Sequence, residues 1–432
     1  MIAAFIDDIS PQLVKWRRSF HREPELGFME YITTYKIGKE LQRLGYTIYL
    51  GKDVMQDESR LGVPENKKLI EQETIAQEWG VEESWLHHMR GGFTGVIATI
   101  DTGKTGNHLS FRFDIDALPI DECKESSHFP SQHHFASAFQ NVMHACGHDG
   151  HMTIGLGLAA FIAKYINELK GRYTLIFQPA EEGGRGAKAI VDKGWLDDVD
   201  YFYAGHIGIQ PLAVGEVAAT TEGFLASTKL NVTFQGESSH AGMQPELGKN
   251  ALLAAATAVS NLYAIPRHSE GITRINVGKL MAGNGRNIIA DNSKMEVETR
   301  GITRKVNQYM FEEAKRIIES AASMHDVHSH IEEVGSTNEI VCSEELISHI
   351  SACCANGVYI KNIIPEITVM GSEDASYMVD QVQKNGGKAT YMLFGTHLHY
   401  PHHHPRFDFQ EKLLPVALET FIRIVLAERT SS

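Results

Sequence analysis

The 432-residue chain lacks the features that mark membrane and secreted proteins. No apolar run approaches the ~20 residues that a membrane span needs. Near the N-terminus, Asp7 and Asp8 stand where a signal peptide would require an apolar stretch. The five cysteines are odd in number and show no paired spacing, which favours a reducing compartment over a disulfide framework. We therefore expect a cytoplasmic protein without a membrane partner.

Two further absences narrow the class of function. There is no lysine- or arginine-rich block, and the net charge of −14 argues against a nucleic-acid partner. There is no Gly-x-Ser-x-Gly sequence, which argues against a serine hydrolase. Hydrophobic content of 43% and charged content of 22% are typical of globular proteins, and the length predicts about two domains.

Histidine and cysteine, by contrast, are concentrated in one short run. Residues 144–151 read His-Ala-Cys-Gly-His-Asp-Gly-His. The thiolate of Cys146 and the imidazole of His148 can converge on one metal ion, because only Gly147 separates them. A histidine-rich surface loop is the alternative, and the density of ligand types favours the metal site.

A second candidate segment spans residues 173–184. Residues 173–177 are apolar, β-branched or aromatic and predict a buried strand, which Pro179 should end. Glu181 and Glu182 follow immediately. Neighbouring residues in extended chain point in opposite directions, so one glutamate can bind a metal while the other faces substrate. The alternative is an acidic turn in solvent.

Two more segments carry histidine. Residues 201–206 form an apolar run that ends in His206, and residues 402–404 are three consecutive histidines. A single histidine at a strand end is more often structural than a ligand. The four segments together nevertheless supply Cys, His, Glu, His and His, with one carboxylate left as a base. This is the set that a two-metal hydrolase needs.

The pattern of strands and helices predicts an α/β fold. Two helices are expected between Ile2 and Leu44, split near Pro24, and a further helix at residues 153–169. Strands alternating with helices imply a mostly parallel mixed sheet with helices on both faces. The candidate segments follow strand ends, where ligands gather in such sheets. The expected buried strands are residues 108–113, 173–177, 201–204 and 390–394.

Residues 222–334 have a different pattern. The predicted order is β-α-β-β-α-β, which suits a small ferredoxin-like α+β domain. Because the chain on both sides carries candidate ligands, this domain is an insertion into a metal-binding domain formed by residues 1–221 and 335–432. Its expected elements are strands at residues 229–234, 274–281, 294–300 and 329–333 and helices at residues 250–264 and 306–324.

Residues 53–90 look like an insertion. They hold nine acidic against four basic residues, and Ile75, Trp79, Leu86 and Met89 recur at helical spacing. An extra solvated helix with one packed face is the favoured interpretation, and a role in substrate binding is the alternative.

Motifs along nearly the whole chain resemble those of the two-metal peptidases and amidohydrolases that include aminoacylase, hippurate hydrolase, auxin-conjugate hydrolases and glutamate carboxypeptidase. Within this family the chain is most similar to the branch of p-aminobenzoyl-glutamate hydrolase A subunits, which also carries an insertion near residues 53–90. The remaining motifs are Trp-Arg-Arg-Ser-Phe-His-Arg-Glu-Pro-Glu at 16–25, Arg-Phe-Asp-Ile-Asp-Ala-Leu-Pro at 112–119, Ser-His-Ala-Gly at 239–242, Gly-Arg-Asn-Ile-Ile at 285–289, Gly-Ser-Glu-Asp at 371–374 and Phe-Asp-Phe at 407–409.

The resemblance implies a fold of the zinc-peptidase type and a role for each candidate residue. Glu181 would be the general base, and Asp116 would orient a ligand histidine without binding metal. Asp114 stands where other branches carry a metal-binding histidine, so its ligation is left open. His402 and His404 are the alternatives to His403. The implied metal ligands are Cys146, His148, Glu182, His206 and His403.

The resemblance also implies a substrate and partners. The inserted domain would be a lid and dimerisation domain, with His240 and Asn287 reaching substrate in the partner's site and Arg300 binding a carboxylate. The expected reaction is hydrolysis of an N-acyl amino acid, with p-aminobenzoyl-glutamate the best candidate and indole-acetyl-aspartate or hippurate the alternatives. The cofactors would be two divalent ions, Mn or Zn, with Co or Ni as further candidates. A homodimer or a heterodimer with a related B subunit is expected. A non-catalytic partner subunit is disfavoured because all six positions are filled.

Overall fold

The computed structural model describes residues 1–427, whose contacts divide them into two compact units. Each unit has its own sheet and its own buried apolar core. The chain segments before and after the second unit both belong to the first unit. We therefore call the first the main unit and the second the inserted unit. Among the described residues, the main unit comprises 1–222, 340–369 and 374–427, and the inserted unit comprises 223–339 and 370–373.

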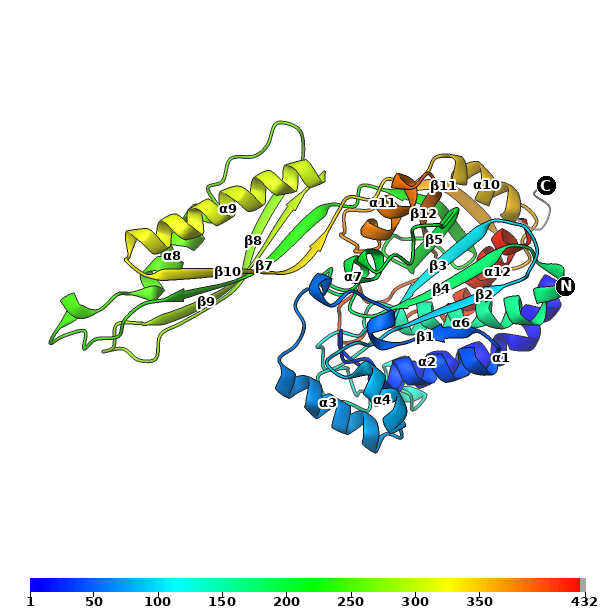
Figure 1. Ribbon diagram of the computed structural model, residues 1–432, viewed down its shortest axis with the longest axis horizontal. Coiled ribbons are helices and arrows are strands. Elements are labelled where there is room, and N and C mark those ends of the chain that lie inside the picture. The colour runs from blue at the N-terminus through cyan, green and yellow to red at the C-terminus, as the bar shows by residue number, and fades with distance from the viewer. Residues whose placement is uncertain (428–432) are drawn as a thin grey trace. The chain divides into compact units, whose positions relative to one another are not determined.

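An eight-stranded mixed sheet forms the centre of the main unit, in the order β1-β2-β4-β3-β5-β12-β6-β11 (Figure 1). Strands β4, β3, β5 and β12 are parallel neighbours, so their carboxyl ends lie along one edge of the sheet. Ligands bind at such an edge in α/β proteins. The strands are β1 (Thr47–Tyr49), β2 (Val96–Asp101), β3 (His108–Asp114), β4 (Arg172–Gln178), β5 (Tyr201–Ile207), β6 (Glu216–Glu222), β11 (Asn362–Thr368) and β12 (Lys388–Phe394).

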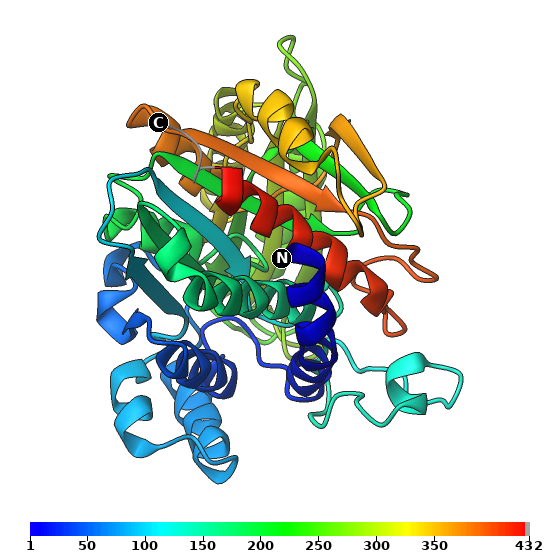
Figure 2. The same ribbon diagram turned by 90° about the vertical axis from the view of Figure 1, so that its right-hand side faces the viewer.

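Helices cover this sheet. Helices α1 (Ile2–Arg22), α6 (His148–Lys164) and α12 (Leu414–Ala427) pack against one another and lie in front of the sheet in Figure 2. On the side away from α1, α7 (Ala187–Asp192) packs against α11 (Ser376–Lys384), which rests on β5 and β12 (Figure 1). The other helices of this unit are α2 (Tyr31–Arg43), α3 (Asn66–Glu78), α4 (Glu83–Met89), α5 (Phe129–Gln132) and α10 (Glu345–Cys354).

Helix α6 is the most deeply buried helix near the candidate site, and small residues make its close packing possible. A Cβ at Gly155 would lie 2.6 Å from the ring of Phe113, and one at Gly157 would lie 2.9 Å from Leu13. Protein interiors are packed as densely as organic crystals, so these contacts fix the helix position. The first turn of α6, which begins at His148, is thereby held at the sheet edge.

The inserted unit has the β-α-β-β-α-β order of a ferredoxin-like domain (Figure 1). Its four strands are antiparallel and lie in the order β10-β7-β9-β8. Asn250 and Thr303 cap the two helices, each accepting a backbone N–H bond with its side chain. The elements are β7 (Ala226–Gln235), α8 (Ala251–Leu262), β8 (Thr273–Ala282), β9 (Asn292–Gly301), α9 (Arg304–Met324) and β10 (His328–Thr337).

The expected α/β class is confirmed, and each expected strand is present within a few residues of its expected bounds. Two expectations need correction. The helix expected at residues 153–169 begins at His148, five residues earlier, because Gly147 adopts the left-handed conformation that starts it. The segment 53–90 forms two helices, α3 and α4, instead of one. Among the described helices, none combines the length and the apolar character of a membrane span.

Candidate metal centre

The candidate centre begins at the first turn of α6. Gly147 has a φ of 92°, a left-handed conformation that glycine adopts without a steric penalty. The helix therefore starts at His148, two residues after Cys146. The Sγ of Cys146, a ring nitrogen of His148 and a carboxylate oxygen of Glu182 lie within 4.8 Å of one another. The structure thus brings together three of the residues proposed as ligands from the sequence.

His206, at the end of β5, places an imidazole beside the same thiol. Its Nε2 lies 3.4 Å from the Sγ of Cys146, and its Nδ1 donates to the carbonyl oxygen of Ile207 at 2.8 Å. Burial, and then the neighbouring His151 and His402, lower the pKa of His206 well below its ordinary value. The ring is therefore neutral with an unprotonated Nε2, the form in which histidine binds metal ions.

Asp116 orients His148. The Nδ1 of His148 donates to the backbone carbonyl oxygen of Asp116 at 2.8 Å and lies 3.3 Å from its carboxylate. The buried Nε2 has no hydrogen-bond partner within residues 1–427, and carboxylate oxygens of Asp114 and Glu181 lie at 3.8 and 4.0 Å. Burial opposes a charge on the ring, but Asp114 and then Asp116 raise the pKa of His148 to about 10. This environment favours positive charge at the position of Nε2.

The two glutamates follow β4 on a strained turn. Ala180 has a φ of 52°, which is uncommon outside glycine, and its N–H donates to the carboxylate of buried Glu30 at 2.8 Å. Two residues on, the N–H of Glu182 donates to Asp116 at 2.9 Å. In the described part of the chain the buried Oε1 of Glu182 has no hydrogen-bond partner. The turn thus presents Glu181 and Glu182 to the cluster.

The three consecutive histidines point in different directions. His403 has a φ of 64°, and its Nε2 lies 3.4 Å from the Oε1 of Glu182, although the ring is 53% exposed. His402 is more buried and is grouped with Cys146 and His206, but its Nε2 donates to the carbonyl oxygen of Ile207 at 3.0 Å. His404 stacks on Tyr400, and its Nδ1 accepts the N–H of Arg406 at 3.0 Å. His402 and His403 are therefore the two that border the cluster.

His151 also lies in the cluster, although no role was predicted for it from the sequence. Its Nδ1 lies 2.5 Å from an oxygen of Asp114, and its Nε2 accepts the backbone N–H of Ile207 at 2.9 Å. Both ring nitrogens thus have partners within the protein. His151 is three residues after His148 on one helix, and this spacing places the two side chains on one face. The spacing is the sequence signal that could have indicated His151 as part of the cluster.

The cluster has the donors and the unsatisfied polar atoms that a divalent cation would require. Two buried atoms without hydrogen-bond partners in residues 1–427, the Nε2 of His148 and the Oε1 of Glu182, belong to residues within 4.8 Å of the Cys146 thiol. Buried polar atoms without partners are costly, so a ligand for them is expected. Burial, and next Glu182 and Glu181, raise the pKa of the Cys146 thiol well above its ordinary value. A bound cation would be needed to stabilise the thiolate.

The inserted unit carries the residues that the sequence suggested for substrate binding. His240 and Asn287 are exposed in adjacent loops, joined by a hydrogen bond from the N–H of Ala241 to the carbonyl oxygen of Asn287 at 3.0 Å. The Nδ1 of His240 accepts two backbone N–H groups of its own loop, which leaves the proton on Nε2. Arg300 donates to Glu298 at 3.0 Å near the far end of β9, roughly 25 Å away along the strand. This unit alone does not bring all three together.

Comparison with known proteins gives matches along the whole chain. The A subunit of p-aminobenzoyl-glutamate hydrolase from Escherichia coli (strain K12) is 42% identical over 423 residues, which are 98% of this chain and 97% of that protein. Indole-3-acetyl-aspartic acid hydrolase of Enterobacter agglomerans is 42% identical over 421 residues, which are 97% of this chain and 96% of that protein.

Solved structures match equally broadly. An aminobenzoyl-glutamate utilization protein from Klebsiella pneumoniae has a TM-score of 0.85 and 38% identity, covering 99% of this chain and 98% of its own. A dinuclear metal-binding peptidase of the M20 family from Bacillus subtilis has a TM-score of 0.65 and 25% identity, and the match covers 98% of this chain and 100% of that one. The profile of Peptidase family M20/M25/M40 matches residues 110–427. These matches confirm the resemblance inferred from the motifs and show that the chain belongs to Peptidase family M20/M25/M40.

Proposed function

We propose that the chain is a metal-dependent amidohydrolase that cleaves N-acyl amino acids, with p-aminobenzoyl-glutamate, hydrolysed to p-aminobenzoate and glutamate, as its substrate. The convergence of Cys146, His148 and Glu182 beside the Glu181 carboxylate carries this proposal. The full-length identity to a hydrolase subunit named for that substrate supports it. Indole-3-acetyl-aspartate is the second candidate, because the relative named for it is as similar in sequence.

Five side chains would hold two divalent ions, Mn or Zn, with Co or Ni also compatible with the donor set. Cys146, His148, Glu182 and His206 are proposed on their mutual distances. His403 is proposed as the fifth because its Nε2 lies near the unsatisfied Oε1 of Glu182, whereas the Nε2 of His402 is already used by a backbone carbonyl.

Charge and position assign the proton transfers to Glu181. When bound, the metal ions would acidify a water molecule and polarise the amide carbonyl. The Glu181 carboxylate would accept a proton from that water and return it to the leaving nitrogen. Asp116 keeps both His148 and Glu182 in place through the bonds described above. The non-catalytic alternative is disfavoured because none of the six proposed positions is substituted.

Recognition of the amino-acid part would come from residues of the inserted unit. We propose that Arg300 binds the free carboxylate of the leaving amino acid, because a guanidinium group forms two parallel hydrogen bonds with a carboxylate. His240, with its proton on Nε2, and Asn287 would donate to the acyl oxygen in the partner's site. A homodimer or a heterodimer with a related B subunit, located in the cytoplasm, completes the proposal. Two relatives are named as A subunits, which supports a B subunit.

The proposal is tested with metal-reconstituted protein and a panel of N-acyl amino acids. We expect turnover to be fastest with p-aminobenzoyl-glutamate, and preference for indole-acetyl-aspartate would establish the alternative. Glu181→Gln should keep its metal and lose several orders of magnitude in turnover, whereas the matched Glu182→Gln should lose metal. Metal loss in Glu181→Gln, together with retained metal and lost turnover in Glu182→Gln, would require the two roles to be exchanged. No turnover of any amide by the parent protein would refute the proposal.

A further inference from the structure

One fully buried arginine joins two of the four chain segments that carry the proposed ligands. Arg17 of α1 has an exposure of 0%. Its Nε donates to Asp149 at 2.8 Å, its Nη2 donates to Asp408, and its Nη1 lies 3.4 Å from Glu411. The guanidinium also lies over the ring of Phe409, 4.4 Å from its centroid. A single side chain thus contacts the start of α6 and the chain that follows the histidine triplet.

The environment is matched to a permanent positive charge. Burial alone would lower the pKa of Arg17, but Asp408, then Asp149 and Glu411, raise it above its ordinary value. An isolated buried charge is strongly unfavourable, and only a complete set of partners offsets that penalty. Arginine presents its donors in a planar fork, so the partners are held in fixed directions as well as neutralised.

Both partner segments lie next to proposed metal ligands. Asp149 directly follows His148 in the first turn of α6. Asp408 follows His403 by five residues in the loop between β12 and α12. The two segments are separated by more than 250 residues of sequence, so backbone connectivity alone does not set their spacing. The backbone N–H of His403 donates to the carbonyl oxygen of Ala145 at 2.8 Å, and the contacts of Arg17 join the two segments a second time, from the side of α1.

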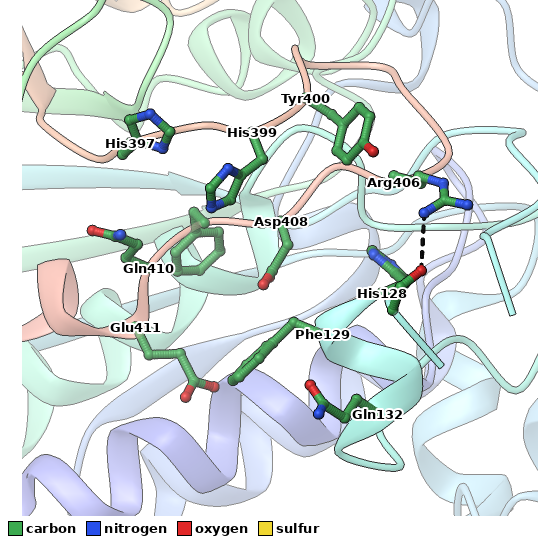
Figure 3. A pocket seen from close by; sticks show the side chains of 12 residues that line it. His128, Phe129, Gln132, His397, His399, Tyr400, Arg406, Asp408, Gln410 and Glu411 are labelled. Atoms are coloured by element: carbon green, nitrogen blue, oxygen red, sulfur yellow. Dashed lines mark hydrogen bonds between the residues drawn. The ribbon is translucent and has the colours of Figure 1, made fainter. Parts of the chain in front are cut away.

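Two of the three acidic partners border a cavity, whereas Arg17 does not. Asp408 and Glu411 line a cavity of about 660 Å³ together with Phe129 (Figure 3). On this outer side a second arginine, Arg18, binds Glu411 with two hydrogen bonds of 2.8 Å and is 31% exposed. Arg18 therefore shares one partner of Arg17, and within residues 1–427 it forms no hydrogen bond or ion pair with Asp149 or Asp408. It is a matched control.

We infer that Arg17 is a positioning residue of the metal centre, which, together with the backbone bond of His403, fixes the distance between His148 and His403 by holding Asp149 and Asp408 together. This inference rests on the proposed function, because it concerns the geometry of the proposed ligand set. Partners that orient metal ligands typically change metal affinity by about 10- to 100-fold when they are removed.

The test compares Arg17→Lys with Arg18→Lys, since both keep the charge and remove the fork. Dissociation constants of Zn²⁺ and Co²⁺ are measured by competition with a chelator, together with the thiolate–Co²⁺ absorption spectrum and the apoprotein melting temperature. We expect Arg17→Lys to weaken metal binding by about 10- to 100-fold and to alter the Co²⁺ spectrum. Arg18→Lys should resemble the unaltered protein in both.

A third variant guards against simple loss of folding. Asp408→Asn leaves the bond from Arg17 to Asp149 intact and removes only the negative charge on the side of His403, because the amide oxygen can still accept a hydrogen bond. It should weaken metal binding, and it should also lower the apoprotein melting temperature because it removes one charge partner of buried Arg17, so metal binding is measured well below the melting transition. Unchanged metal affinity and an unchanged Co²⁺ spectrum in folded Arg17→Lys or Asp408→Asn would overturn the inference. Failure of the unaltered protein to bind metal would instead refute the proposed function.

Discussion

Replacing His21 with glutamine should make the main unit less sensitive to alkaline pH. His21 is fully buried, with its Nδ1 2.9 Å from Asp149 and its Nε2 3.0 Å from Glu122. Burial alone would lower the pKa of His21, but the charge of Glu122 and hydrogen bonds to both carboxylates outweigh burial and raise it from 6.5 to about 9. Folding therefore stabilises the protonated form of His21.

The difference between the folded and unfolded pKa of His21 determines the sign and size of its contribution to stability. The folded pKa lies above the unfolded one, so the contribution is fully present below pH 6.5 and is lost as the pH rises through about 9. Because one pKa unit corresponds to about 1.4 kcal/mol, His21 should contribute about 3 kcal/mol at pH 6 and almost nothing at pH 10. Glutamine cannot carry charge, so His21→Gln should lack this dependence.

Urea unfolding followed by tryptophan fluorescence measures this contribution. All four tryptophans, Trp16, Trp79, Trp85 and Trp195, belong to the main unit, so the signal reports that unit. The protein is kept in chelator, because metal binding would add its own pH dependence. The stability difference between the parent and His21→Gln should shrink by about 3 kcal/mol between pH 6 and pH 10. Parallel pH profiles for the two proteins would refute the reasoning.

Three other changes test separate parts of the account. Cys146→Ser should weaken metal binding, measured by metal analysis after dialysis, without altering the melting temperature of the apoprotein, because a hydroxyl is a poorer anionic ligand than a thiolate; unchanged binding would remove Cys146 from the centre. Gly155→Ala should destabilise the main unit by about 1–3 kcal/mol in urea, because its Cβ would lie 2.6 Å from the ring of Phe113, and an unchanged midpoint would contradict that packing. Mixed dimers of His240→Ala and Glu181→Gln should recover activity that both parents lack. No recovery, with heterodimers verified by native mass measurement, would confine His240 to its own loop.

The parts of the fold that the sequence predicted are those with a strong local signal. The apolar strand β4 ends before Pro179, which has no N–H to donate to a neighbouring strand. The β-α-β-β-α-β order follows from the spacing of apolar residues, which changes between the strand period and the helix period. Strands β1, β2, β6 and β11 were not predicted, and in β11 Pro365 interrupts the apolar pattern. The structure tolerates that proline because β11 lies at the edge of the sheet.

The candidate site likewise contains residues that could be proposed from the sequence and residues that could not. Cys146 and His148 could be proposed because their ligand chemistry is concentrated in eight residues. Arg17 and His21 belong to the motif at residues 16–25, but no role was predicted for them, because their partner Asp149 lies 132 and 128 residues away. The choice within the histidine triplet depends on ring directions, which spacing does not determine.

The most direct test of the central proposal is a titration of apoprotein with Zn²⁺ or Mn²⁺ in which bound metal and p-aminobenzoyl-glutamate hydrolysis are measured in the same samples. We predict that hydrolysis rises with occupancy to a maximum at about two ions per chain and that chelation abolishes it. Full hydrolysis in chelator, with less than roughly a tenth of an ion per chain, would contradict the proposal.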